Sequence, residues 1–135
     1  MKDGKIISIK NLVKKFPVGK GFFTALEDIT IDVERGEFSG LVGPSGSGKT
    51  TLLNMMGSLD NPTEGTVEVL DREITELSHK QAARMRSTHM GFIFQTYNLL
   101  PVYTVYENVE FPLLLLDMTP ARRKKAVLEA LEWVG

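Results

Sequence analysis

The pattern of hydrophobic and polar residues changes along this chain of 135 residues. In its earlier part, short apolar or alternating runs are separated by clusters rich in Gly, Pro, Asn and Asp. Such runs are typical of β-strands, because successive strand side chains point to opposite faces of a sheet. Strands are predicted over residues 6–12, 29–33, 37–42, 66–70 and 90–94.

Helices are predicted between and after these strands, over residues 48–57, 77–86, 104–116 and 120–134. Ser78 and Thr119 are the expected N-caps of two of them, and Pro120 would take the first helical position, which proline favours. Residues 14–21 contain Pro17 and two glycines and are predicted to form a loop. Strands and helices therefore alternate first, and an all-helical segment follows.

One stretch carries recognisable chemistry. It reads Gly43-Pro44-Ser45-Gly46-Ser47-Gly48-Lys49-Thr50 and fits the phosphate-binding loop, or Walker A motif, G-x-x-x-x-G-K-[ST] without a mismatch. A predicted strand precedes it and a predicted helix follows it, which is the context that this motif requires. The glycines allow the backbone to turn its N–H groups toward a phosphate.

The other residue types of this loop suit a nucleoside triphosphate. Lys49 can place an ammonium beside the β- and γ-phosphates, and Thr50 can offer a hydroxyl to Mg²⁺, which prefers oxygen ligands. The helix start adds unpaired N–H groups and the positive end of its dipole. The alternative is a Gly- and Ser-rich surface turn that happens to hold a lysine, and the flanking elements argue against it.

Composition narrows the classes of function. Sixteen basic and seventeen acidic residues give a net charge of −1, so no nucleic-acid partner is expected. The chain has no cysteine, which excludes disulfides and thiolate metal sites. The longest apolar run lies near Pro112 and is far shorter than the ~20 residues that span a bilayer, so any membrane role should come through a partner.

Beyond the phosphate loop, three further stretches resemble the N-terminal part of an ATP-binding cassette (ABC) ATPase. They are Leu-Glu-Asp-Ile at 26–29, Glu-Arg-Gly-Glu at 34–37 and Gly-Phe-Ile-Phe-Gln at 91–95, in the family's order. Residues 53–65 and 94–101 resemble one branch more narrowly, that of lipoprotein-release, macrolide-export and antimicrobial-peptide-resistance transporters. The resemblance covers essentially the whole chain.

This resemblance implies an α/β fold of the P-loop NTPase class, ABC ATPase type. Residues 1–95 would form the nucleotide-binding core with an N-terminal antiparallel β subdomain, and residues 96–135 would begin the helical subdomain. Phe16 would stack on adenine, or Phe22 or Phe23 would do so in its place. The alternative without a ligand is that Phe16 simply packs on the neighbouring strand.

The resemblance also implies roles near the phosphates. Gln95 matches the glutamine of the family's Q-loop, which contacts Mg²⁺ and the attacking water. Thr51 matches the position whose hydroxyl meets the α-phosphate. In the complete protein, Lys49, Thr50 and Gln95 would position the phosphates, the metal ion and the water.

Three motifs of the family are not found in this sequence: a Walker B strand that ends in Asp-Glu, a signature motif of the LSGGQ type and a late switch histidine. Two segments imitate Walker B. Asp71 ends a run that Glu68 interrupts, and Asp117 follows four leucines that favour a helix, and no glutamate follows either aspartate. We therefore expect an N-terminal fragment that ends before the signature motif and is inactive alone.

The predicted strands 37–42 and 90–94 raise a question of stability. In the resembling family, their parallel neighbours come from later sequence, so both are expected to lack a partner. Each buried unpaired backbone group costs about 1–3 kcal/mol. The chain should be marginal as a monomer and ordered through an oligomer, an exchanged element or companion residues.

The family implies a function and its partners. The implied cofactors are Mg²⁺ and ATP. The implied partners are a second ATPase subunit and a transmembrane permease that docks near Gln95 and the helical segment. The expected location is cytoplasmic, at the inner face of the cell membrane. ATP hydrolysis would drive export across the membrane or extraction from it. The alternatives are a non-transport ABC ATPase, a small-molecule kinase, a GTPase, and a nucleotide-binding module without hydrolysis. The N-K-x-D pattern of a GTPase is not found in this sequence.

Overall fold

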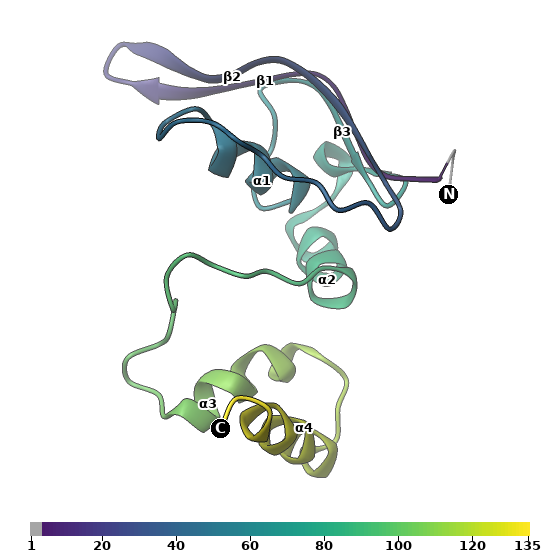
Figure 1. The fold of residues 1–135 in the computed structure, drawn as a ribbon, viewed down its shortest axis with the longest axis vertical. Helices are drawn as coiled ribbons and strands as arrows, with labels where there is room; N and C mark the ends of the chain where they lie inside the picture. The colour runs from purple at the N-terminus through teal and green to yellow at the C-terminus, as the bar shows by residue number, and fades with distance from the viewer. Residues whose placement is uncertain (1–3) are drawn as a thin grey trace. The chain divides into compact units, whose positions relative to one another are not determined.

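The computed structural model describes residues 4–135, which form two compact units, one ending at Arg86 and the other beginning at Ser87. The first unit holds a small antiparallel sheet with a helix against it, and the second is helical (Figure 1). This division lies inside a helix, and the domain boundary predicted after residue 95 stays a prediction.

A long hairpin dominates the first unit. Strands β1 (Lys5–Val18) and β2 (Gly21–Glu34) pair antiparallel from Lys5 opposite Glu34 to Val18 opposite Gly21. The predicted loop over residues 14–21 is therefore wrong, because β1 continues through Pro17. Beyond Val13, β1 pairs only with β2 and so lies at the edge of the sheet, where proline is tolerated.

The hairpin continues into a four-stranded sheet. Strand β3 (Glu64–Val69) pairs antiparallel with β1, and the short β4 (Arg72–Glu73) pairs with β3, so the order is β2-β1-β3-β4. The turn between β3 and β4 passes through Asp71, which has a positive φ of 61°. Asp71 thus lies in a turn between two antiparallel strands and does not end a Walker B strand, as predicted.

Helix α1 (Lys49–Met56) packs against this sheet (Figure 1). Its Leu52 and Met55 are buried, and the sheet contributes apolar side chains that are buried as well. The fully buried members of the set are Ile9, Leu12, Met55, Val67 and Val69. The core of the first unit therefore lies between α1 and one face of the sheet, which fixes the helix that follows the phosphate loop.

Helix α2 (His79–His89) follows the 3-10 turn η2 (Ile74–Glu76). Its start carries the predicted cap, because the Ser78 hydroxyl accepts from the Gln81 amide at 3.4 Å and the Gln81 side chain accepts from the Ser78 amide at 2.9 Å. This reciprocal pair is a capping box, in which glutamine takes the place that glutamate often fills.

Two predicted strands are not strands in this structure. Residues 37–42 and 90–94 have no strand assignment, and the side chains of Phe38, Val42 and Ile93 are exposed. A continuously apolar strand needs neighbours on both sides to satisfy its backbone and cover its side chains. Within residues 4–135, no strand pairs with either segment.

The second unit consists of α3 (Val105–Glu110), the 3-10 helix η3 (Phe111–Leu115) and α4 (Pro120–Glu132). The single helix predicted over 104–116 is thus divided near Pro112, and the leucine run is helical and not a Walker B strand. Thr119 caps α4 as predicted, and the Glu110 carboxylate accepts from the Arg123 guanidinium at 2.8 Å, joining α3 to α4. No helix among the described residues is long and apolar enough to span a bilayer.

Candidate phosphate-binding site

The phosphate loop leads directly into α1, as the motif predicts. The amide of Ser47 donates to the carbonyl of Pro44 at 3.3 Å and closes a turn within the loop. Gly46 and Gly48 have φ values of 79° and 85°, in the left-handed region that favours glycine. These two positions let the loop turn back on itself before the helix starts.

An added side chain would meet close contacts at two glycines of this loop. A Cβ on Gly43 would lie 2.7 Å from the Ser47 hydroxyl oxygen. A Cβ on Gly48 would lie 2.7 Å from the carbonyl oxygen of Ala25 and 2.8 Å from Cδ2 of Leu26. Because Ala25 and Leu26 belong to β2, the loop rests on the hairpin, and the hairpin sets the position of the loop.

The side chain of Lys49 lies across the loop. Its Nζ donates to the carbonyl oxygens of Gly43 at 2.8 Å and Pro44 at 2.7 Å, and it lies 3.4 Å from the Ser47 hydroxyl oxygen. The ammonium is therefore held over the curve of the loop, although its residue is the first of α1. This placement puts a positive charge against the backbone of the loop.

The start of α1 adds donors to this charge. Its N-cap, Gly48, makes no side-chain capping hydrogen bond, and the first turn holds no acidic residue. The first N–H groups of a helix lack intrahelical partners and lie at the positive end of its dipole, so they favour an anion. Thr50 is exposed and Thr51 is half-buried in this first turn.

The segment that enters the loop carries one perturbed carboxylate. The Ser39 hydroxyl and the Glu34 amide both donate to Glu37, and these hydrogen bonds, that of Ser39 first, lower the pKa of Glu37. Glu37 is therefore anionic at neutral pH and engaged within its own turn. Glu37 lies outside the phosphate loop at residues 43–50.

The predicted adenine-stacking residue lies on the hairpin. Phe16 is in β1 opposite Phe23 of β2, and the two alternatives, Phe22 and Phe23, are exposed near the hairpin end. Phe16 is 37% exposed, so part of its ring faces solvent. The ammonium of Lys14 lies 5.0 Å from the centre of this ring.

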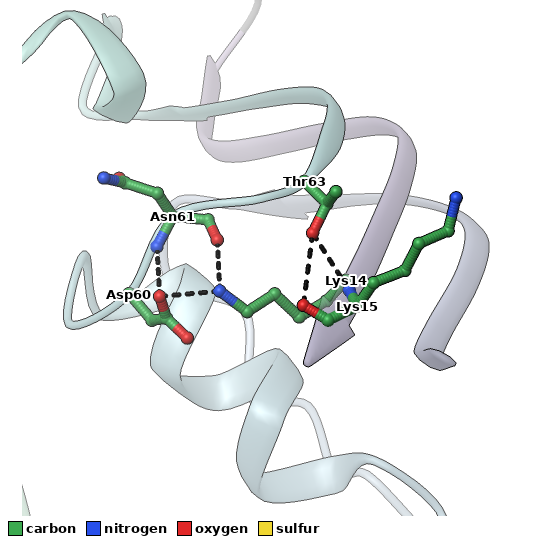
Figure 2. A network of polar contacts seen from close by, with 5 residues as sticks. All are labelled: Lys14, Lys15, Asp60, Asn61 and Thr63. Atoms are coloured by element: carbon green, nitrogen blue, oxygen red, sulfur yellow. Dashed lines mark hydrogen bonds and ion pairs between the residues drawn. The ribbon is translucent and has the colours of Figure 1, made fainter. Parts of the chain in front are cut away.

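Lys14 was not singled out by the sequence reasoning. Its Nζ donates to Oδ1 of Asp60 at 2.7 Å and to the carbonyl oxygen of Asn61 at 2.7 Å (Figure 2). The available signal was its position two residues before Phe16, which places both side chains on one face of a strand. Because residues 14–21 were predicted to form a loop, this strand spacing was not applied to Lys14 and Phe16.

Gln95 belongs to the second unit. It lies in a stretch without helix or strand and is exposed. Its role beside Thr50 stays a prediction. The structure thus brings together the loop, Lys49 and the start of α1, and it places Phe16 on the hairpin of the same unit.

A phosphate-rich ligand fits this arrangement. The loop offers glycine amides, a held ammonium, an uncapped helix start and two threonine hydroxyls. Within residues 4–135, no group of three or more histidine, aspartate or glutamate side chains is placed to hold a metal ion.

Comparison with known proteins agrees with this geometry. The family model described as "ABC transporter" matches residues 26–135. The macrolide export ATP-binding/permease protein MacB of Bartonella henselae is 41% identical over 130 residues, which cover 96% of this chain and 20% of MacB. The uncharacterized ABC transporter ATP-binding protein MJ0796 of Methanocaldococcus jannaschii is 38% identical, over 94% of this chain and 55% of its own length.

Solved structures show the same likeness. A dimeric post-hydrolysis state of the ATP-binding cassette MJ0796, bound to ADP and Pi, superimposes with a TM-score of 0.84 at 37% identity. That match covers 93% of this chain and 56% of the solved chain. The chain thus spans about half the length of its ATP-binding relatives. It belongs to the ABC transporter family and forms part of an ABC ATP-binding domain.

Proposed function

We propose that this chain binds Mg-ATP through the phosphate loop at residues 43–50. The observation that carries the proposal is the position of Lys49, whose ammonium lies over the loop at the uncapped start of α1. The glycine amides would hold phosphate oxygens, and Lys49 would neutralise the β- and γ-phosphates.

The remaining site residues are assigned by the family pattern together with their placement. Thr50, exposed in the first turn of α1, would offer its hydroxyl to Mg²⁺, and Thr51 would reach the α-phosphate. Phe16 would stack on adenine. From the resemblance we also assign Gln95 to the metal ion and the attacking water, as an amide that can accept a hydrogen bond without adding charge.

In the complete protein we propose that ATP hydrolysis drives transport across or out of a membrane. When bound, ATP would supply a phosphoanhydride bond whose hydrolysis to ADP and inorganic phosphate is favourable and would provide the driving free energy. The MacB relative joins ATP-binding and permease functions in one protein, and the solved MJ0796 cassette is dimeric. These relatives support a permease partner and a second ATPase subunit. From the resemblance we further propose that the ATPase lies on the cytoplasmic side of the membrane.

This chain alone is expected to bind ATP without turning it over. Its sequence contains neither a Walker B Asp-Glu pair nor a signature motif, so the water and the developing charge would lack partners. Titration calorimetry with Mg-ATP should show saturable binding at a single site, and a phosphate-release assay should stay at background. Steady release that Thr50→Ala abolishes would contradict the second expectation, and absence of binding would contradict the first.

A further inference from the structure

Lys14 is held in place by a partly buried network. Its side chain is only 11% exposed, and its Nζ forms an ion pair with Oδ1 of Asp60 at 2.7 Å. The same Nζ donates to the carbonyl oxygen of Asn61 at 2.7 Å. The Asn61 amide also donates to Oδ1 of Asp60 at 2.7 Å, which fixes that carboxylate (Figure 2).

The segment that supplies these acceptors is itself joined to β1. The Thr63 amide donates to the carbonyl oxygen of Val13 at 2.8 Å. The Lys15 amide donates to the Thr63 hydroxyl at 2.9 Å, as Figure 2 shows. Asp60 follows closely on α1, which ends at Met56. The ammonium of Lys14 is therefore positioned by residues that continue from the helix of the phosphate loop.

The same ammonium lies against Phe16. It is 5.0 Å from the ring centre, within the distance at which a cation is attracted to an aromatic face. Lys14 has three partners, the Asp60 carboxylate, the Asn61 carbonyl and the ring, so its position is well determined. Phe16 is 37% exposed, so part of the ring stays accessible to a base while Lys14 lies against it.

We infer that Lys14 is a positioning residue for recognition of the nucleotide base. It fixes the orientation of the Phe16 ring relative to α1, and so relates the base-stacking face to the phosphate site at the start of that helix. The ligand class is the adenine base of a bound nucleotide. This inference rests on the proposed function, and Lys14 itself does not touch the phosphates.

The test compares two anions on the full chain, Mg-ATP and Mg-tripolyphosphate, which has no base. Lys14→Met keeps the length of the side chain but removes the cation, and it should weaken ATP binding about two- to fivefold while tripolyphosphate binding is unchanged. Lys15→Met is the matched control, because it removes the same charge from a more exposed ion pair, that of Lys15 with Glu64. That control should leave the affinities for Mg-ATP and Mg-tripolyphosphate unchanged. Lys14→Arg, which keeps the positive charge, should bind ATP as the wild type does.

A double-mutant cycle separates positioning from a direct effect of charge. In a Phe16→Leu background, Lys14→Met should cause no further loss of ATP affinity, because no ring remains to be oriented. An equal loss in both backgrounds would overturn the inference, as would a loss of tripolyphosphate binding in Lys14→Met. If the wild type binds neither anion, the proposed function fails. If it binds both equally well, the phosphate site stands and the role of Lys14 is rejected.

Discussion

Replacing Gly65 with alanine is expected to destabilise the first unit by about 2–5 kcal/mol, the sum of left-handed backbone strain and overpacking. Gly65 has a φ of 83°, and a Cβ there would lie 2.6 Å from the carbonyl oxygen of Lys10 and also against the carbonyl of Asn11. Both obstacles are backbone atoms of β1, which cannot rotate away as a side chain can. The loss is a large part of the roughly 5–15 kcal/mol that stabilises a typical domain.

Urea unfolding followed by far-ultraviolet circular dichroism measures this effect. Gly36→Ala is the matched control, because Gly36 has a similar φ of 79° but no atom within 4 Å of an added Cβ. The control should lose about 1–2 kcal/mol from backbone strain alone. Equal midpoints for the two variants would show that the contact between β3 and β1 at Gly65 is looser than the structure describes.

Replacing Lys49 with alanine should weaken Mg-ATP binding about 10- to 100-fold, because a hydrogen bond to a charged group contributes roughly 1.5–3 kcal/mol. The fold should survive, since the Nζ contacts of Lys49 are to exposed loop carbonyls and the buried residues of α1 are Leu52 and Met55. Titration calorimetry on the wild type and the variant gives the ratio directly.

The control for this substitution is Lys80→Ala. Lys80 is an exposed lysine near the start of α2, so its replacement removes the same charge from a different helix. The affinity of the Lys80→Ala variant for Mg-ATP should equal that of the wild type. Equal losses in both variants would indicate general attraction of an anion to a positive surface and would argue against a specific role of Lys49.

The phosphate loop was predictable because its information is local. Consecutive residues set the glycine conformations at Gly46 and Gly48, the start of α1 and the position of Lys49. The two helix caps at Ser78 and Thr119 were predictable for the same reason, since each side chain bonds to an amide three residues later. In each case, the partners lie within one or two turns of chain.

The parts that escaped prediction depend on distant partners. The outer part of the hairpin resembles a loop in sequence because Pro17 and two glycines interrupt it, yet cross-strand pairing such as Phe16 opposite Phe23 makes it a strand. The pairing of Lys14 with Asp60 joins residues 46 positions apart, and no short pattern announces it. The apolar segment 37–42 has the sequence pattern of a strand. A strand forms only where a neighbouring strand pairs with it, and the local pattern does not show whether such a neighbour is present.

The most direct test of the central claim is to locate bound nucleotide by NMR. In a titration of the full ¹⁵N-labelled chain with Mg-ATP, the amide signals of Gly46, Gly48 and Lys49 should shift together and saturate. The signal of Gly36, at the far end of the segment that enters the loop, should stay in place. Saturable binding of Mg-ATP that leaves the three loop amides unchanged would contradict the account, because the nucleotide would then occupy a different site.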